Sequence, residues 1–234
     1  GYICGSCNAS IGKFHEKIDN QLKDWLADET TEQTVSVHGA KGMGVSTYLS
    51  HYKYKLESDG LRCLDLKVPA KSFTEKALES LLEPLEEIEE DDKVIVFMDN
   101  AHNFFLSTIG GFEIYKKFLE KIEELRNVFF IVGFNDHSWM FLNSVLGKNQ
   151  YFRLECSLPK WSVEKLKEFI LFLHSRTEYS LEYDPIFRSS QKVQEGVTSS
   201  ENRYFYLLWE RSGGNPGTAI YYWFRSLKQL REKH

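Results

Sequence analysis

The sequence predicts an α/β fold in which a five-stranded parallel sheet is flanked by helices and followed by a C-terminal all-helical subdomain. Short apolar segments alternate with helical patterns from residue 34 to residue 156, which is typical of parallel strands joined by crossover helices. A glycine-rich turn joins the first strand to the helix that follows it. After Leu158-Pro159, the remaining segments have only helical or loop patterns.

The predicted strands are short apolar runs at residues 34–38, 61–66, 93–100, 127–135 and 151–156. The third contains five consecutive apolar residues, Val94 to Met98, which indicates a strand buried on both faces. Asp99 closes this strand, and open parallel sheets bind their ligands at the carboxyl ends of the strands. Asp99 is therefore a candidate ligand-contacting residue, and the fourth strand likewise ends in a polar residue, Asn135.

Apolar residues at helical spacing predict helices before and between these strands, at residues 11–28, 47–57, 72–90, 112–125 and 138–146. Ser72 and Glu75 have the spacing of a capping box at the start of the third helix. Pro84 is expected to kink or divide that helix, because proline removes a backbone donor.

The C-terminal part is predicted to contain three helices. Ser162 caps the first, the second covers residues 204–211 and ends at Gly213-Gly214, and Pro216 opens the third, which runs to about residue 230. Residues 189–202 are polar and predict a loop. These patterns divide the chain into an N-terminal segment with a linker helix (1–32), an α/β core (33–157) and a helical subdomain (158–234).

The net charge of −5 argues against sequence-independent binding of nucleic acid, which needs a basic surface. Seven acidic residues lie between Glu83 and Asp92. They predict a solvated helix end, with a docking site for a basic partner as the alternative.

The four cysteines predict thiols and no zinc site. Cys63 and Cys156 adjoin apolar strands and are expected to be buried in a reducing compartment, which favours a cytoplasmic location. Cys4 and Cys7 form a single C-x-x-C pair with only His15 nearby, whereas a structural zinc site needs four ligands. No run of 18 apolar residues is present. The chain starts with Gly1, which suggests that it is a piece of a longer protein. Membrane association is expected only through segments that lie outside this sequence.

Residues Gly39 to Thr47 match the phosphate-binding pattern G-x-x-x-x-G-K-[ST] at every position but one. Such a loop turns backbone amides toward an anion, and the N-terminus of the next helix adds partial positive charge. Val45 stands where the pattern has lysine, so the side chain that contacts the outer phosphates is missing. Two interpretations stay open: a nucleotide-binding loop without its lysine, and a strand-to-helix turn that binds nothing.

In these motifs and their order, the chain resembles the AAA+ and STAND classes of P-loop ATPases. It is most similar to the branch that contains origin-recognition proteins and archaeal STAND-like ATPases. The likeness covers residues 11–232 and rests on five segments: Gly39 to Ser46, Val94 to Asp99, Phe134-Asn135, Leu158-Pro159, and Gly213 to Pro216. It implies the strand order 5-1-4-3-2 and a helical lid over a nucleotide.

The resemblance also implies roles for individual residues. Asp99 would hold Mg²⁺ through water, Ser46 would give the ion a hydroxyl ligand, and Asn135 would orient water near the last phosphate, unless its side chain bonds only to backbone. The implied cofactor is ATP or ADP with Mg²⁺, and whether it binds is left open. The candidate nucleotide-binding residues are Gly39, Lys41, Gly42, Gly44, Val45, Ser46, Thr47, Asp99, Asn135 and Pro216.

Four groups that act on phosphate charge in the family are absent. Val45 replaces the loop lysine, Asn100 the glutamate after Asp99, and Gly217 the lid arginine. An arginine finger is also missing, since Lys148 is the only cation between residues 138 and 152. Losing one such group costs on the order of 10²–10⁵ in rate. Lys41 and His102 are the alternative phosphate cation and the alternative base.

These residues predict a degenerate ATPase domain that serves as a regulatory or scaffolding module, with weak or absent nucleotide binding and little or no hydrolysis. Two alternatives stay open. One is an unorthodox ATPase that uses Lys41, His102 or a partner protein for the missing chemistry. The other is a nucleotide-free interaction domain that uses the aromatic residues of its C-terminal helices. A protein partner or self-assembly is expected, and nucleic acid is not.

Overall fold

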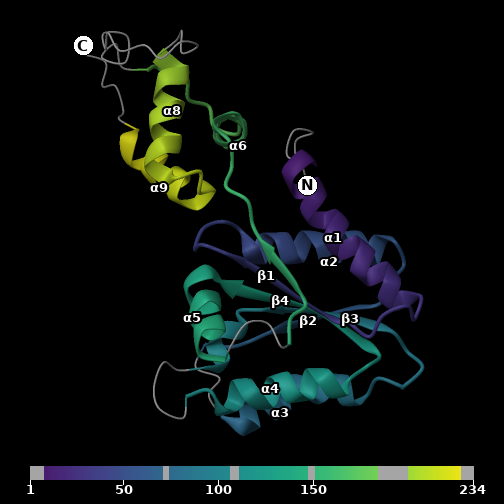
Figure 1. Ribbon diagram of the computed structural model, residues 1–234. Coiled ribbons are helices and arrows are strands. Elements are labelled where there is room, and N and C mark those ends of the chain that lie inside the picture. The colour runs from purple at the N-terminus through teal and green to yellow at the C-terminus, as the bar shows by residue number, and fades with distance from the viewer. Residues whose placement is uncertain (1–7, 71–73, 106–110, 147–150, 184–199, 228–234) are drawn as a thin grey trace. The chain divides into compact units, whose positions relative to one another are not determined.

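The computed structural model describes residues 8–70, 74–105, 111–146, 151–183 and 200–227. Its strands form one five-stranded sheet in the order β2-β3-β4-β1-β5, with every pairing parallel (Figure 1). This confirms the predicted fold class and strand order. The strands are β1 (Thr34–Gly39), β2 (Cys63–Lys67), β3 (Val94–Asp99), β4 (Val128–Asn135) and β5 (Leu154–Ser157).

Helices cover both faces of this sheet, as Figure 1 shows. On one face, α1 (Asn8–Leu26) and α2 (Val45–Ser58) pack against Ile95 and Phe97 of β3. On the other, α3 (Glu75–Glu86), α4 (Glu113–Glu124) and α5 (Asp136–Leu146) pack against Val94 and Val96. The alternation follows from the pleat, because successive side chains of a strand point to opposite faces.

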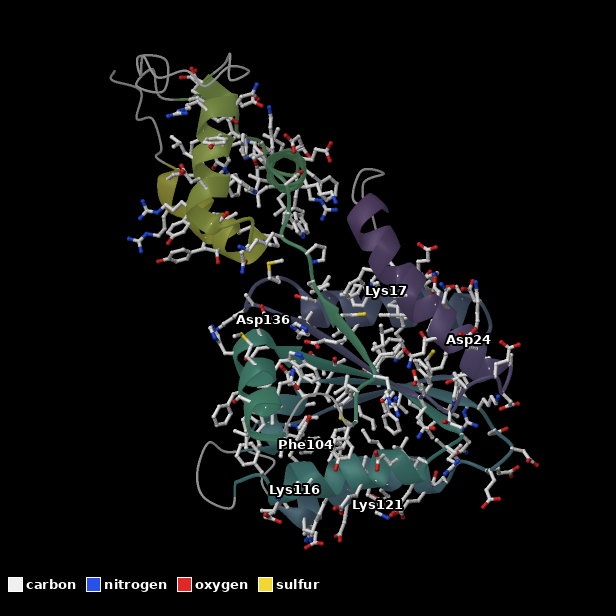
Figure 2. All side chains as sticks on the ribbon, viewed as in Figure 1. Lys17, Asp24, Phe104, Lys116, Lys121 and Asp136 are labelled. Atoms are coloured by element: carbon white, nitrogen blue, oxygen red, sulfur yellow. The ribbon has the colours of Figure 1, made fainter. Side chains whose placement is uncertain are left out.

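Phe104 shows how the second face is filled. It lies in the short 3-10 helix η2 (Ala101–Phe104), is fully buried, and packs its ring 5.0 Å from that of Phe118 on α4. Figure 2 labels Phe104 above α4, whose Lys116 and Lys121 lie on the outer side. The apolar stripe of α4 thus faces the sheet and its lysines face solvent.

The predicted third helix is wrong at both ends. It begins at Glu75, because the Thr74 hydroxyl caps it by accepting from the Ala77 N–H over 3.3 Å. Ser72 lies outside the described residues. The helix ends at Glu86, so Pro84 falls in its last turn, where losing one backbone donor disturbs little.

Other predicted boundaries also need correction. The second strand begins at Cys63 rather than Leu61, and the last helix ends at Ser226 rather than near residue 230. The fifth strand begins at Leu154 rather than Tyr151, since it pairs with β1 only from the register pair Val35–Leu154 onward. Residues 200–202, predicted as part of a loop, open a helix: Lys167 contacts Glu201 over 2.6 Å and Asn202 over 2.7 Å. The rest of the predicted loop, residues 189–199, lies outside the described residues.

The chain divides into two compact units, Asn8–Leu158 and a second that includes the chain from Pro159 onward. The second contains α6 (Val163–His174), α8 (Ser200–Ser212) and α9 (Pro216–Ser226) around a small apolar cluster. Ser162 caps α6 as predicted, accepting from the Lys165 N–H over 3.3 Å. Gly214 approaches Trp161 so closely that a Cβ there would lie 2.7 Å from the Trp161 carbonyl oxygen.

The two thiols that the structure describes differ in exposure. Cys156 is buried, as predicted, whereas Cys63 is only half buried. Burial raises the pKa of each to about 11, which makes both poor nucleophiles at neutral pH. Cys4 and Cys7 lie outside the described residues.

Candidate functional site

The glycine loop occupies the turn between β1 and α2. Gly42 (φ 93°) and Gly44 (φ 90°) adopt the left-handed backbone region that favours glycine. The Met43 N–H donates to the Ala40 carbonyl over 2.9 Å, and the Met43 side chain is buried. The loop therefore has a fixed shape that other residues would not adopt at positions 42 and 44.

The N-terminus of α2 has no side-chain cap. Gly44 is the N-cap residue, and the first helical bond runs from the Tyr48 N–H to the Gly44 carbonyl over 2.8 Å. The amides before Tyr48 thus have no acceptor within the helix. Ser46 and Thr47 are exposed in this first turn. An uncapped helix start behind a glycine loop can bind an anion.

The Val45 side chain lies against the end of the sheet. A Cβ built on Gly39 of β1 would be 3.3 Å from Val45 Cγ2, and one on Gly133 of β4 would be 3.1 Å from Val45 Cγ1. The two glycines leave the space that the valine methyl groups fill. Val45 therefore acts as a packing residue between α2 and the sheet.

Asp99 approaches the same point from β3. Its Oδ1 would lie 3.1 Å from a Cβ on Gly133, and it accepts the Asn100 N–H over 2.8 Å. Asn100 itself has left-handed backbone angles (φ 59°, ψ 34°). The structure thus brings Gly39, Val45 and Asp99 together around Gly133.

Gly133 is the residue of this group that the sequence motifs do not include. A signal was present, because an isolated glycine inside an otherwise apolar strand indicates a close approach by another part of the chain.

Asn135 stands beside Gly39 in the register of β4 and β1. Its side-chain oxygen accepts the Ser138 N–H over 2.8 Å and so caps α5. The side chain thus bonds to backbone, as in the alternative interpretation.

His102, the alternative base, lies in η2 after Asn100. Its Nδ1 is buried without a hydrogen-bond partner. Burial lowers the pKa of His102, although the charge of Asp99 opposes that shift. A neutral imidazole is therefore the expected form at neutral pH.

Two further candidates are Lys41 and Pro216. Lys41 is exposed on the glycine loop. Pro216 belongs to the second unit, where it occupies the first turn of α9 behind Asn215, whose Oδ1 accepts the Thr218 N–H over 3.0 Å.

Within the described residues, no three His, Cys, Asp or Glu side chains are grouped to hold a metal ion. No helix in the same residues has the length and apolar character to cross a membrane.

Comparison of sequences finds no matching family model and no matching curated protein. Comparison of structures finds many. The ORC2 protein of Aeropyrum pernix, in its ADPNP-ADP complexes, has a TM-score of 0.52 and 11% identity over 99% of this chain and 71% of that one. PCH-2 of C. elegans has a TM-score of 0.52 and 16% identity over 85% of this chain and 57% of that one.

The ADP form of the Aeropyrum pernix protein also matches, with a TM-score of 0.52 and 12% identity over 89% of this chain and 60% of that chain. The chain thus spans less than two thirds of two of these three structures. At these identities the likeness concerns the fold alone. The chain has the fold of the AAA+ P-loop ATPases.

Proposed function

We propose that this chain is a degenerate ATPase-fold domain that binds ATP or ADP weakly, hydrolyses it little or not at all, and serves as a regulatory or scaffolding module. The observation that carries the proposal is the position of Val45 between Gly39 and Gly133. The glycine loop is present, but an apolar side chain occupies the position of the phosphate-binding lysine.

Binding would rest on backbone amides. The left-handed glycines and the uncapped start of α2 fit a phosphate group, since both direct N–H dipoles at one anion. Ser46 and Asp99 would hold the Mg²⁺ that accompanies the phosphates. Lys41 is the cationic side chain of the loop. Because Val45 replaces the usual loop lysine, a bound phosphate would lack one charge-assisted hydrogen bond.

Hydrolysis would be slow because the groups near Asp99 are unsuited to it. Asn100 is an amide that cannot accept a proton from water. The imidazole of His102 can accept a proton, but its Nδ1 is buried without a hydrogen-bond partner. Asn135 engages its side-chain oxygen at the start of α5. This site would therefore bind a nucleotide without hydrolysing it efficiently.

A scaffolding role is supported by apolar side chains on the surface. Tyr221, Phe224 and Leu227, in and just after α9, are 53%, 62% and 43% exposed. On α5, Met140 and Val145 are 68% and 49% exposed. Large exposed apolar side chains in groups are typical of protein-binding surfaces.

The melting temperature in millimolar Mg-ATP and Mg-ADP tests the proposal, because a ligand that binds only the folded state raises it. Two variants make the test specific. Gly44→Val forces a branched side chain into a left-handed position and should abolish the shift. Asp99→Asn keeps an oxygen for the Asn100 N–H but removes the charge, and should abolish the dependence of the shift on Mg²⁺.

An unchanged melting temperature in either nucleotide would contradict binding and favour a nucleotide-free interaction domain. Steady release of phosphate that disappears in Asp99→Asn would instead favour an unorthodox ATPase.

A further inference from the structure

A second group of polar side chains lies next to the candidate site, around His38 of β1. Its Nδ1–H donates to Asp136 Oδ1 over 2.7 Å, and its Nε2 lies 3.1 Å from Glu155 Oε1. The Trp139 ring stacks on the imidazole with centroids 5.5 Å apart and planes 18° from parallel. The Trp139 indole N–H donates to Glu155. This group joins β1, α5 and β5.

The two contacts of the imidazole are not equivalent. Nδ1 and Asp136 have both the distance and the geometry of a hydrogen bond. Nε2 and Glu155 have only the distance of an ion pair, since Nε2 makes no hydrogen bond that meets the usual geometry. The His38–Asp136 bond is therefore the directional link in this group.

The His38–Asp136 bond connects β1 to the start of α5, next to the candidate site. Gly39, the first residue of the glycine loop, pairs in register with Asn135. His38 precedes Gly39, and Asp136 follows Asn135 at the start of α5, where Figure 2 labels it. The His38–Asp136 bond thus ties the residue before the loop to the residue after Asn135.

We propose that His38 is a positioning residue for the candidate nucleotide site, which holds Asn135 level with the glycine loop through its bond to Asp136. The proposal rests on the proposed nucleotide binding. Asn135 Oδ1 caps α5 at the Ser138 N–H. If the Asn135 side chain turns toward a phosphate, that cap is lost, and the His38–Asp136 bond remains to hold the start of α5.

Two substitutions separate the contacts of His38. In His38→Asn, the side-chain NH₂ stands close to the position of Nδ1 and can still donate to Asp136. In His38→Gln, the NH₂ reaches toward the position of Nε2 and Glu155 instead. Both remove the stacking on Trp139, so a comparison of the two isolates the Asp136 bond. Glu155→Gln is the control for the other contact.

Calorimetric titration with Mg-ADP is the first measurement. His38→Asn and Glu155→Gln should bind within about twofold of the unmodified chain, and His38→Gln about tenfold more weakly, a coupling of usual size for residues in one network. Asp136→Leu should weaken binding equally, and combining it with His38→Gln should add nothing. Equal affinities for His38→Asn and His38→Gln would overturn the proposal.

Amide exchange without nucleotide is the second measurement, and it does not depend on binding. The Ser138 N–H and its neighbours in the first turn of α5 should exchange faster in His38→Gln and at the normal rate in His38→Asn. If the unmodified chain binds no Mg-ADP, the proposed function fails while this exchange pattern still tests the bond. An identical pattern in both variants would show that His38 does not position α5.

Discussion

The Val45 side chain and Gly133 are in contact across α2 and β4: a Cβ on Gly133 would lie 3.1 Å from Val45 Cγ1. The same Cβ would lie 2.8 Å from Leu49 Cδ1 and 3.1 Å from Asp99 Oδ1. The absence of a side chain at Gly133 is thus what lets α2 sit on the sheet and what brings Val45 beside Asp99.

Gly133→Ala should lower the free energy of unfolding by about 1–3 kcal/mol, the usual cost of overpacking. Denaturant unfolding measures it. Combining it with Val45→Ala should cost less than the sum of the two separate losses, because the shorter side chain relieves one of the close contacts of the new methyl group. If the two substitutions instead prove strictly additive, Val45 and Gly133 are not in contact.

Val45→Lys should restore the missing cation. The lysine stem can follow the path of the valine between Gly39 and Gly133 and carry its ammonium group beyond it. We expect the dissociation constant for Mg-ATP to fall about tenfold, or ~1.4 kcal/mol. Val45→Met is the matched control, since it has a similar stem and no charge. Calorimetric titration checks both, and equal affinities for the two variants would mean that no phosphate reaches this side chain.

Replacing Asn100 by glutamate should destabilise the fold, because Asn100 has a left-handed backbone (φ 59°). Asn100→Glu should cost about 1–2 kcal/mol of stability, since longer side chains disfavour this region, and Asn100→Gly should cost less than either Glu or Ala. Thermal unfolding of the three variants checks the order. A glutamate variant as stable as the glycine variant would show that the backbone at position 100 is not strained.

The sequence predicted β3 and β4 well because each is a short apolar run with a distinct end, whereas the more polar β2 and β5 were predicted to begin too early. Residues Val94 to Met98 are all buried, and Asp99 follows them at the carboxyl end of β3, as the sequence pattern predicted. The strand order was not derivable from periodicity and came from the resemblance. Local caps were harder to predict, because Ser72 and Thr74 are both common capping residues and lie two positions apart.

The candidate site was predictable only where its residues form a contiguous sequence motif. The glycine loop is contiguous, and its left-handed positions fall at Gly42 and Gly44. The His38–Asp136 bond joins residues 98 positions apart, and no local pattern announces it. Where a side chain points is likewise a tertiary property, so the packing of Val45 against Gly133 had to come from the structure.

His15 links α1 to α2 and should make the fold sensitive to acid. Its ring lies 5.2 Å from that of Tyr48 and 5.1 Å from that of Tyr52. Burial lowers the pKa of His15 from its ordinary value of 6.5, and the charges of Lys55 and His51 add to this against the opposing charge of Asp19. The folded state therefore favours the neutral ring.

As the pH falls, His15 is protonated at a higher pH in the unfolded chain than in the folded one. The contribution of His15 to the free energy of unfolding is therefore fully present above pH 6.5 and is lost as the pH falls below it. His15→Phe keeps a ring for Tyr48 and Tyr52 but cannot titrate. Denaturant unfolding of both proteins at several pH values should show the unmodified chain losing stability relative to His15→Phe on acidification. A constant difference between pH 7.5 and pH 5 would contradict the lowered pKa.

Equilibrium dialysis with labelled ATP and Mg²⁺, followed by separation of the nucleotides on the protein side, tests binding without hydrolysis most directly. We predict an excess of label with the protein that is recovered as ATP after hours, and no excess with Gly44→Val. Recovery of the label as ADP over many turnovers, lost in Asp99→Asn, would contradict the proposed function, as would the absence of any excess label.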